Sequence, residues 1–364
     1  MAGLIRPILM YTLALAAYAA VPVVSAAKTP PKHTVSRTTV KDAQQGVLYA
    51  TRADAMLVAD DIAQRRDLDR EWVRSAIGQA RHQPQITRWV LPAATGTAKN
   101  WRVYRSRFID PVRIAAGVAF WQANAATLER AEREYGVPPE IIVGIIGVET
   151  IYGRDTGKFR VMDALATLSF DFPGAHPRAR ERREFFLGEL EQLLSLAQRT
   201  GTDPLDFRGS YAGAMGMPQF MPSSWNKYAI DFDGDGQVDL SGSSADAIGS
   251  VANYFKAFGW QRGLPTHYPV RFDKATLDLD ALLAPDILPT FSVASFTAKG
   301  ALLEGDGAQA KGPLALIELQ NGNAEPTYVA GTENFYAITR YNWSSYYAMA
   351  VIELGREVAA ARAR

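Results

Sequence analysis

Apolar residues recur at spacings of three and four from about residue 55 to residue 134, and again at 177–199 and 244–258. The segment DAMLVADDIAQRRDLDREWVRSAIGQA is a clear example. This spacing places the apolar side chains on one face of an α-helix. The sequence therefore predicts amphipathic helices over these ranges, with a helical domain at residues 51–134.

One helix is predicted to be buried on every side. Gly136 is expected to end the helix before it, because glycine is common just after a helix C-terminus. Pro138-Pro139-Glu140 then forms a suitable first turn. The run that follows, IIVGIIGV, has no polar face. A helix of this composition must lie inside the protein.

The pattern changes after about residue 262. The segments HYPVRF, TFSVASFTA, PLALIELQ and PTYVAG are short, β-branched or aromatic, and separated by Gly, Pro and Asp. Asn321-Gly322 predicts a hairpin between two of them. These segments predict a small β-rich domain at 263–330, after which 331–364 return to helical spacing and to the helical body. The predicted fold is mainly α, of the α+β class.

The N-terminus is typical of an export signal. Arg6 precedes an apolar run from Ile8 to Val24, and small residues follow it, which predicts a signal peptide at 1–27. A polar, Pro-containing linker is expected at 28–50. We therefore expect a periplasmic protein that associates with the cell envelope. The apolar run approaches the ~18 residues that span a membrane, so a retained anchor is the alternative.

Composition excludes several classes of function. Lys and Arg total 39 against 38 for Asp and Glu, so the chain lacks the basic surplus typical of nucleic-acid binding. The chain has no cysteine, which excludes disulfides, thiol catalysis and lipoprotein anchoring. Its four histidines show no metal-ligand spacing, which argues against a zinc enzyme.

Glu149 is the strongest candidate for an acid/base group, because it ends the all-apolar helix. Desolvation raises the pKa of a carboxylic acid, and a raised pKa suits a general acid near neutrality. The alternative is a structural ion pair with Arg154 or another base. No second acidic residue is expected in an equally apolar context, since Asp155, Asp163 and Asp171 lie in polar or turn-like segments.

The segment GSYAGAMGMPQFMPSSW at 209–225 has the composition of a sugar-binding cleft. Its glycines allow close backbone approach. Amides and hydroxyls bind sugar OH and N-acetyl groups, and aromatic rings cover apolar sugar faces. A tightly packed Gly/Ala helix contact is the alternative.

The segments ETIYG, SYAGAMGMPQFMPSSW and ENFYAITRYNWSSYYAMAV, in this order, resemble the lytic murein transglycosylase B family over roughly residues 55–358. The resemblance implies a lysozyme-like helical core at 135–262, with an added helical domain and a small β domain. It implies an enzyme that cleaves the β-1,4 bond between N-acetylmuramic acid and N-acetylglucosamine in peptidoglycan glycan strands and leaves 1,6-anhydromuramic ends. Separately, we expect the protein to be a monomer. A hydrolase of the same glycan and a calcium-stabilised, non-catalytic peptidoglycan-binding protein are the alternatives.

The resemblance also implies the site residues. Glu149 matches the catalytic glutamate. The substrate-binding candidates are Ser210, Gln219, Tyr254, Tyr341, Asn342 and Tyr347. One carboxyl group is sufficient if the C6 hydroxyl of the muramic residue is the nucleophile, with the N-acetyl group assisting. Ser210 or Asn342 is expected to orient that N-acetyl group.

A second motif, DFDGDGQVD at 231–239, matches the front of a calcium-binding EF-hand loop. Asp231, Asp233 and Asp235 fall at loop positions 1, 3 and 5, Gln237 offers a carbonyl at position 7, and Asp239 falls at position 9. Gly242 replaces the usual glutamate at position 12. The resemblance implies that Asp246 closes the site instead. A structural calcium ion is expected; sodium, or a solvated turn without an ion, is the alternative.

Overall fold

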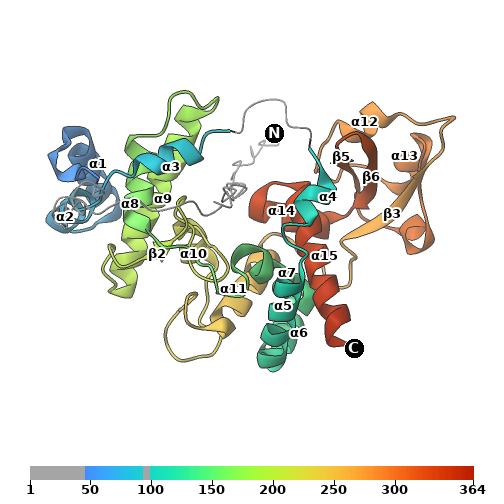
Figure 1. The fold of residues 1–364 in the computed structure, drawn as a ribbon, viewed down its shortest axis with the longest axis horizontal. Coiled ribbons are helices and arrows are strands. Elements are labelled where there is room, and N and C mark those ends of the chain that lie inside the picture. The colour runs from blue at the N-terminus through green and yellow to red at the C-terminus, as the bar shows by residue number, and fades with distance from the viewer. Residues whose placement is uncertain (1–45, 93–98) are drawn as a thin grey trace, which may run out of the picture.

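The computed structural model describes residues 46–92 and 99–364, and it has helical lobes at two ends with a small sheet on one of them (Figure 1). The signal peptide predicted at 1–27 and most of the predicted linker lie outside the described residues. The mainly α, lysozyme-like fold expected from the sequence is confirmed.

The helices are α1 (Ala53–Arg66), α2 (Arg70–Gly78), α3 (Pro84–Trp89), α4 (Trp101–Arg105), α5 (Pro111–Ala123), α6 (Ala125–Tyr135), α7 (Pro139–Thr150), α8 (Val161–Phe170), α9 (Ala179–Thr200), α10 (Pro222–Tyr228), α11 (Ser244–Ala257), α12 (Leu279–Leu283), α13 (Val293–Ala298), α14 (Glu333–Asn342) and α15 (Ser345–Arg362). The strands are β1 (Phe159–Arg160), β2 (Arg208–Gly209), β3 (His267–Phe272), β4 (Ala301–Leu303), β5 (Ala315–Asn321) and β6 (Ala324–Gly331). Short 3-10 helices occur at Tyr49–Thr51 and Gly305–Gln309.

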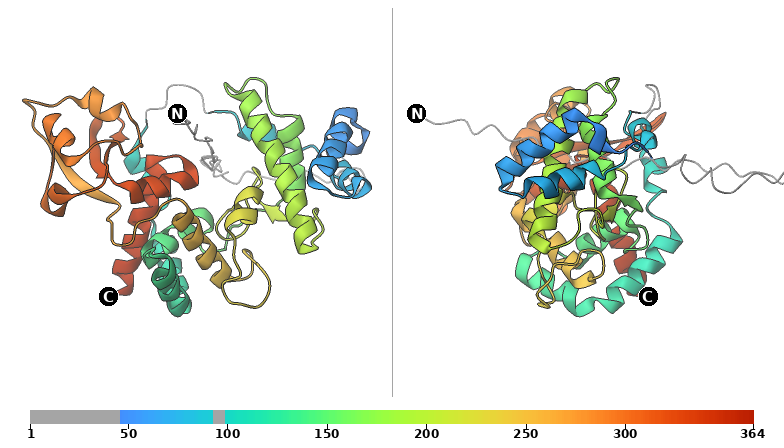
Figure 2. Two further views of the ribbon diagram at one scale, coloured as in Figure 1. Left: turned by 180° about the vertical axis from the view of Figure 1, so that it is seen from behind. Right: turned by 90° about the vertical axis from the view of Figure 1, so that its left-hand side faces the viewer.

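The helices at residues 51–134 are divided between the two lobes, which differs from the single helical domain that the sequence predicted. α2 and α3 pack against α8, whereas α5 and α6 pack against α7 (Figure 1). Glu191 of α9 forms ion pairs with Arg65 and Arg66 of α1. Seen from behind, α1 and α2 lie at the opposite end of the molecule from the β domain (Figure 2). Amphipathic spacing gives each helix an apolar face but does not identify its partner.

The last residues of the predicted linker belong to the folded body. Tyr49 is buried, and its hydroxyl group donates a hydrogen bond to Asp171 Oδ2 at 2.5 Å. Leu48 forms an antiparallel bridge with Arg81. The linker prediction therefore extended too far, because the isolated aromatic residue at its end gave no periodic pattern.

The residues predicted to form a β-rich domain contain an antiparallel sheet with the strand order β4-β3-β6-β5. β5 and β6 form the predicted hairpin, and Gly322 has a φ of 66°. The segment TFSVASFTA was wrongly predicted as β structure. It contains α13, whose first turn is capped by Ser292 Oγ accepting the N–H of Ser295. Phe296 of α13 lies in a small apolar core of this domain.

Two glycines determine how α7 packs against the C-terminal helix α15. A Cβ atom at Gly144 would lie 2.3 Å from a backbone carbonyl oxygen of α15, and one at Gly355 would lie 2.0 Å from a carbonyl oxygen of α7. The backbones therefore approach closely, in antiparallel directions. This register places Tyr347, near the start of α15, beside Glu149, near the end of α7.

Within residues 46–92 and 99–364, no helix combines the length and the apolar character needed to cross a membrane.

Candidate active site

Glu149 lies one residue before the end of α7, where the chain leaves the helix through a left-handed turn. Ile151, Tyr152 and Gly153 have φ values of 51°, 59° and 85°. The amides of Ile151 and Tyr152 donate hydrogen bonds to carbonyl oxygens of the preceding turn of α7. A β-branched residue rarely adopts this conformation. The surrounding structure must therefore hold the turn in place.

The ring of Tyr152 contributes to this by filling space between α5 and α7. A Cβ atom at Gly117 of α5 or at Gly147 of α7 would lie 2.4 Å from the Tyr152 hydroxyl oxygen. Arg113 of α5 donates a hydrogen bond to the Gly147 carbonyl oxygen at 3.0 Å. Glycine at both positions lets the aromatic ring fix the segment that follows Glu149.

The carboxyl group of Glu149 has the properties expected of a general acid. Burial raises its pKa to about 7, against the effect of a hydrogen bond that the Tyr347 hydroxyl donates to Oε1. Among the described residues, no basic side chain forms an ion pair with Glu149, so the alternative of pairing with Arg154 has no support. A pKa near 7 leaves a substantial fraction of this carboxyl protonated at neutral pH.

Three predicted tyrosines form an aromatic cluster beside Glu149. Tyr347 and Tyr341 are nearly parallel, with ring centroids 6.2 Å apart, and Tyr341 lies 4.8 Å from Tyr254. The Tyr341 hydroxyl donates to the Pro218 carbonyl oxygen at 2.5 Å. The Tyr254 hydroxyl donates to a carbonyl oxygen of α14 at 2.8 Å. Tyr254 is therefore buried behind Tyr341 and supports it, with its hydroxyl group already used inside the protein.

Gln219 and Ser210 lie on the glycine-rich segment between β2 and α10. Gln219 has a φ of 51°. Its side-chain nitrogen, Nε2, donates hydrogen bonds to the carbonyl oxygens of Thr156 and Gly216 at 3.1 and 3.0 Å. Ser210 Oγ accepts the N–H of Ala214 at 3.1 Å. These bonds leave the amide oxygen of Gln219 as an acceptor and the hydroxyl proton of Ser210 as a donor.

Asn342, at the end of α14, has a buried side-chain oxygen that accepts no hydrogen bond from the described residues. A buried acceptor without a partner costs about 1–3 kcal/mol. The residue follows Tyr341 in sequence, and it precedes Trp343, which has a φ of 38°. Its Oδ1 is consequently an unused hydrogen-bond acceptor in this structure.

Tyr104 belongs to the site but was not among the residues predicted from the sequence. Burial, with a further contribution from the charge of Glu149, raises the pKa of Tyr104 to about 12. Tyr104 also lines a pocket of about 480 Å³ with Trp343 and Ser344. The sequence offered only a general helical pattern around Tyr104, and its position depends on the short helix α4.

The acidic residues considered as partners of Glu149 have other contacts. Asp163 is buried in α8, not in a polar turn, and it pairs with Arg160 at 2.6 Å. Asp171 pairs with Arg52 at 2.5 Å. The expectation that no second acidic residue lies in an equally apolar context was wrong. Glu189 of α9 is buried with a raised pKa, and it accepts hydrogen bonds from the amide and hydroxyl of Ser223.

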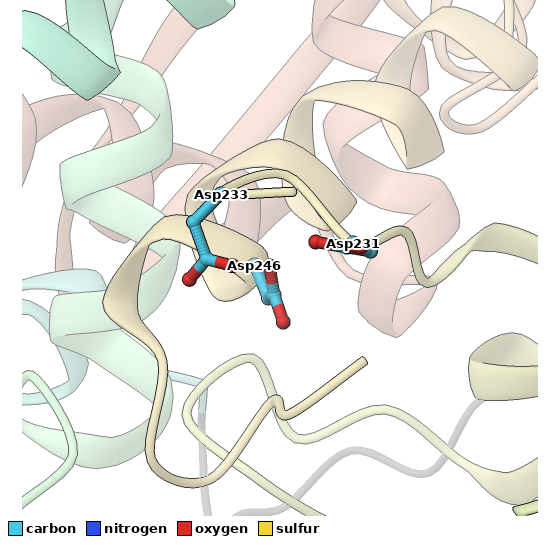
Figure 3. A group of neighbouring side chains, drawn as sticks. All are labelled: Asp231, Asp233 and Asp246. Atoms are coloured by element: carbon cyan, nitrogen blue, oxygen red, sulfur yellow. The ribbon is translucent and has the colours of Figure 1, made fainter. Parts of the chain in front are cut away.

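The structure brings together three of the predicted metal ligands (Figure 3). Carboxylate oxygens of Asp231, Asp233 and Asp246 lie within 4.8 Å of one another. Burial raises the pKa of Asp246, and the neighbouring charge of Asp233 raises it further. No ion pair with Lys or Arg neutralises these three acids in the described part of the chain. This donor set suits a hard divalent cation such as calcium.

The other predicted ligands lie on the same loop but outside this group. Asp235 accepts the amide N–H of Gln237 at 2.8 Å. Asp239, predicted at loop position 9, accepts amide hydrogens of Ser241 and Gly242. The structure supports Asp246 as the residue that closes the loop, because its two carboxylate oxygens accept the amides of residues 232 and 239.

Comparisons with known proteins identify the family of the chain. Residues 51–356 match a family model described as the transglycosylase SLT domain. The membrane-bound lytic murein transglycosylase B of Escherichia coli (strain K12) is 41% identical over 338 residues, which cover 88% of this chain and 86% of that protein.

Solved structures of lytic transglycosylases also match the fold of this chain. The Escherichia coli lytic transglycosylase SLT35 in complex with bulgecin A matches with a TM-score of 0.77 and 40% identity over 91% of this chain and 100% of that chain. The same protein in complex with calcium matches with a TM-score of 0.74, also at 40% identity and with the same coverage. SltB3 of Pseudomonas aeruginosa in complex with NAG-anhNAM-pentapeptide matches with a TM-score of 0.67 and 29% identity, over 82% of this chain and 77% of that chain.

The chain belongs to the transglycosylase SLT domain family. Within it, the chain is an enzyme of the lytic transglycosylase class, of the same type as the murein transglycosylase B relative.

Proposed function

We propose that this enzyme cleaves the β-1,4 bond between N-acetylmuramic acid and N-acetylglucosamine in peptidoglycan strands, leaving 1,6-anhydromuramic ends, with Glu149 as the single acid/base. The observation that supports this most directly is the raised pKa of Glu149 beside the Tyr347 hydroxyl. Relatives described as lytic murein transglycosylases support the substrate class.

In the first step, protonated Glu149 donates its proton to the glycosidic oxygen as the bond from C1 of the muramic residue breaks. Burial keeps the proton on the carboxyl near neutral pH. Charge develops on the sugar ring, and the N-acetyl carbonyl oxygen assists as an internal nucleophile. The N-acetylglucosamine part then leaves with a free hydroxyl group.

In the second step, ionised Glu149 accepts the proton of the C6 hydroxyl group as that oxygen bonds to C1 and displaces the N-acetyl carbonyl oxygen, which restores the neutral acetamide. No water is consumed, and the enzyme recovers its starting protonation state. Two-carboxylate glycosidases use a second acid as nucleophile or base. Asp163, Asp171 and Glu189 are engaged elsewhere, by Arg160, Arg52 and Ser223, which supports a mechanism with one carboxyl group.

The free acceptors of the cleft suggest how the sugar is held. Asn342 Oδ1 accepts the N–H of the N-acetyl group, which turns the carbonyl oxygen of that group toward C1. The amide oxygen of Gln219 accepts a sugar hydroxyl. The Ser210 hydroxyl group donates a hydrogen bond to the same glycan strand. Asn342 is favoured over Ser210 for orienting the N-acetyl group, because its buried oxygen has no partner in the described residues.

The substitution Glu149→Gln tests the proposal, because it keeps the shape of the side chain and removes the acid. Release of anhydro products from purified cell wall should fall by about 10²–10⁴-fold, which is the usual contribution of acid/base catalysis. Mass spectrometry identifies these products, which lack one water compared with hydrolytic ends. Hydrolytic products from the wild type would support the muramidase alternative, and a fully active variant would refute the role of Glu149.

We also propose that Asp231, Asp233 and Asp246, with the Gln237 carbonyl, hold a structural calcium ion. The solved structure of the SLT35 relative in complex with calcium supports this proposal. Calcium supplies no chemistry to the cleavage step here; it neutralises the converging carboxylates and stabilises the loop.

We further propose that residues 1–27 direct export and that the protein acts in the periplasm as a monomer associated with the envelope. The membrane-bound lytic murein transglycosylase B of Escherichia coli, a relative of this chain, supports envelope association. Recovery of the protein from the periplasm tests export. The N-terminal residue of the recovered protein tests cleavage, and its mass in the native state tests the oligomeric state. Recovery of the uncleaved chain in the membrane fraction would favour the retained anchor.

A further inference from the structure

Thr150 follows Glu149 and is fully buried, yet its hydroxyl group reaches beyond its own helix. Thr150 Oγ1 donates a hydrogen bond to the carbonyl oxygen of Met217 at 2.8 Å. It also accepts the amide N–H of Gly153 at 3.0 Å. One side chain thus connects the end of α7, the left-handed turn after it, and the segment that carries Gln219.

Met217 also contacts the carboxylate loop, which we define as residues 231–246. Its amide donates a hydrogen bond to the Leu240 carbonyl oxygen at 2.7 Å. A Cβ atom at Gly216, which has a φ of 71°, would lie 2.7 Å from the same oxygen. This close approach therefore requires glycine at position 216.

Leu240 is directly linked to the acid cluster. The preceding residue, Asp239, donates its amide N–H to Asp246 Oδ2 at 2.8 Å. The other oxygen of Asp246 accepts the amide of Phe232 at 2.7 Å. Three hydrogen bonds and the backbone of residues 239, 240 and 217 therefore connect Asp246 to Thr150 without a gap. Movement of the carboxylate loop would displace Met217 and, through it, the end of α7.

We infer that Thr150 is a positioning residue, which couples the geometry of Glu149 and Gln219 to the state of the carboxylate loop. The inference rests on the proposed function, because it assigns Thr150 a role through Glu149. Gln219 is included because its backbone amide donates to the Gly216 carbonyl oxygen at 3.2 Å, in the same turn as Met217. Cation binding at the loop is consequently transmitted to the catalytic carboxyl.

Two substitutions separate this role from simple packing. Thr150→Val keeps the shape of the side chain and removes the hydroxyl group; Thr150→Ser keeps the hydroxyl group and removes a methyl group. With purified wall as substrate, Thr150→Val should lower kcat at least tenfold with KM changed less than about threefold, since remote misplacement can cost about 10²-fold. It should also shift the pH at which kcat declines. Thr150→Ser should keep kcat within about threefold of wild type.

The matched control is Thr167→Val. Thr167 is also a fully buried helical threonine, and its Oγ1 accepts the amide of Gln83, far from Met217 in the hydrogen-bond network. This variant loses stability but should keep the wild-type kcat and pH profile. Equal kcat values and pH profiles for Thr150→Val and Thr150→Ser would overturn the positioning role.

Amide hydrogen exchange tests the coupling without measuring activity. Adding calcium to the metal-depleted wild type should increase protection at residues 215–219 and also at 147–153. In Thr150→Val, protection at 215–219 should still respond, whereas 147–153 should not. No calcium response at 147–153 in the wild type would overturn the coupling, even if a Thr150 variant fails to fold. Hydrolytic or absent wild-type products would instead refute the proposed function and leave this exchange result valid on its own.

Discussion

At the scale of single residues, two opposing effects determine the pKa of Glu149. Burial favours its protonated form, and the Tyr347 hydroxyl favours its ionised form. The enzyme needs both forms in one reaction cycle, the acid to start cleavage and the base to complete it. A pKa of about 7 is a compromise between these needs.

The substitution Tyr347→Phe should disturb this balance in a defined direction. Loss of the donor leaves burial unopposed, so the pKa of Glu149 should rise. Hydrogen bonds to charged groups contribute about 1.5–3 kcal/mol, which corresponds to a shift of about one unit or more. A general acid loses activity as pH rises through its pKa. The alkaline decline of kcat/KM should therefore move to higher pH, while the rate at the optimum falls because the carboxyl is less well oriented.

A pH–rate profile of wild type and Tyr347→Phe, on the same soluble glycan substrate, measures the shift. A suitable control is Tyr336→Phe on α14, since the Tyr336 hydroxyl accepts only a long contact from Arg340 at 3.3 Å. An unchanged alkaline limb in Tyr347→Phe would contradict the assignment of that limb to Glu149.

The site residues could be predicted from the sequence only where local pattern and chemistry coincide. Glu149 was identifiable because an acid ends an all-apolar helix. Tyr104 was not, because nothing in its own segment shows that a short helix brings it to Glu149 from 45 positions earlier in the chain. Glu189 was missed for a related reason: its apolar environment comes from packing with α10, where Ser223 satisfies the carboxylate.

At the scale of elements, the contact between α7 and α15 determines the active site. Each helix has a glycine where the other backbone passes, and the resulting antiparallel register brings Tyr347 to Glu149. The apolar character of α7 predicts that it is buried, but it contains no information on which helix covers it. The partner is about 200 residues away in sequence and was not predictable from periodicity.

The substitution Gly355→Ala should therefore damage both stability and activity. The new Cβ atom would lie 2.0 Å from the carbonyl oxygen of Glu140, a backbone atom that cannot move alone. Overpacking of this kind costs about 1–3 kcal/mol. The helices must separate, which draws Tyr347 away from Glu149. Chemical denaturation should show the loss of stability, and the kcat of the remaining folded protein should also fall.

Gly188→Ala on α9 is the matched control, because a Cβ atom there meets nothing within 4 Å. Alanine is favoured over glycine inside a helix by roughly 0.5–1 kcal/mol. This variant should be slightly more stable than wild type and fully active. If Gly355→Ala behaved in the same way, the close approach of α7 and α15 would not be what positions the site.

At the scale of the whole molecule, the chain returns repeatedly between its two lobes. α1–α3 lie on the α8–α9 side, α4–α6 on the α7–α15 side, and α8–α10 return to the first side (Figure 1). The expected helical segments at 177–199 and 244–258 are confirmed as α9 and α11, and the hairpin at Asn321-Gly322 is confirmed too. The division of the first helices between lobes depends on long-range contacts such as Glu191 with Arg65, which have no signature in sequence spacing.

Binding of a cation to the carboxylate loop should stabilise the whole folded protein. Asp231, Asp233 and Asp246 place like charges close together in the folded state, and Asp246 is almost completely buried. The unfolded chain separates these charges and binds a cation weakly. A cation that binds only the folded state stabilises it by about 2.7 kcal/mol at a hundredfold excess over Kd. Calcium should therefore raise the melting temperature by several degrees, and a chelator should reverse the increase.

Asp233→Asn should abolish most of this increase, because it removes one of the converging charges without altering the size of the side chain. It should also make the metal-free protein slightly more stable than metal-free wild type, since the repulsion that raises the pKa of Asp246 is relieved. The exposed Asp280 of α12 provides the control: Asp280→Asn should keep the full response to calcium. For a cation site, Asp233→Asn should be more stable than wild type without calcium and less stable than wild type with calcium. For a solvated acidic turn, Asp233→Asn and Asp280→Asn should have equally small effects, and calcium should leave the melting curves of wild type and both variants unchanged.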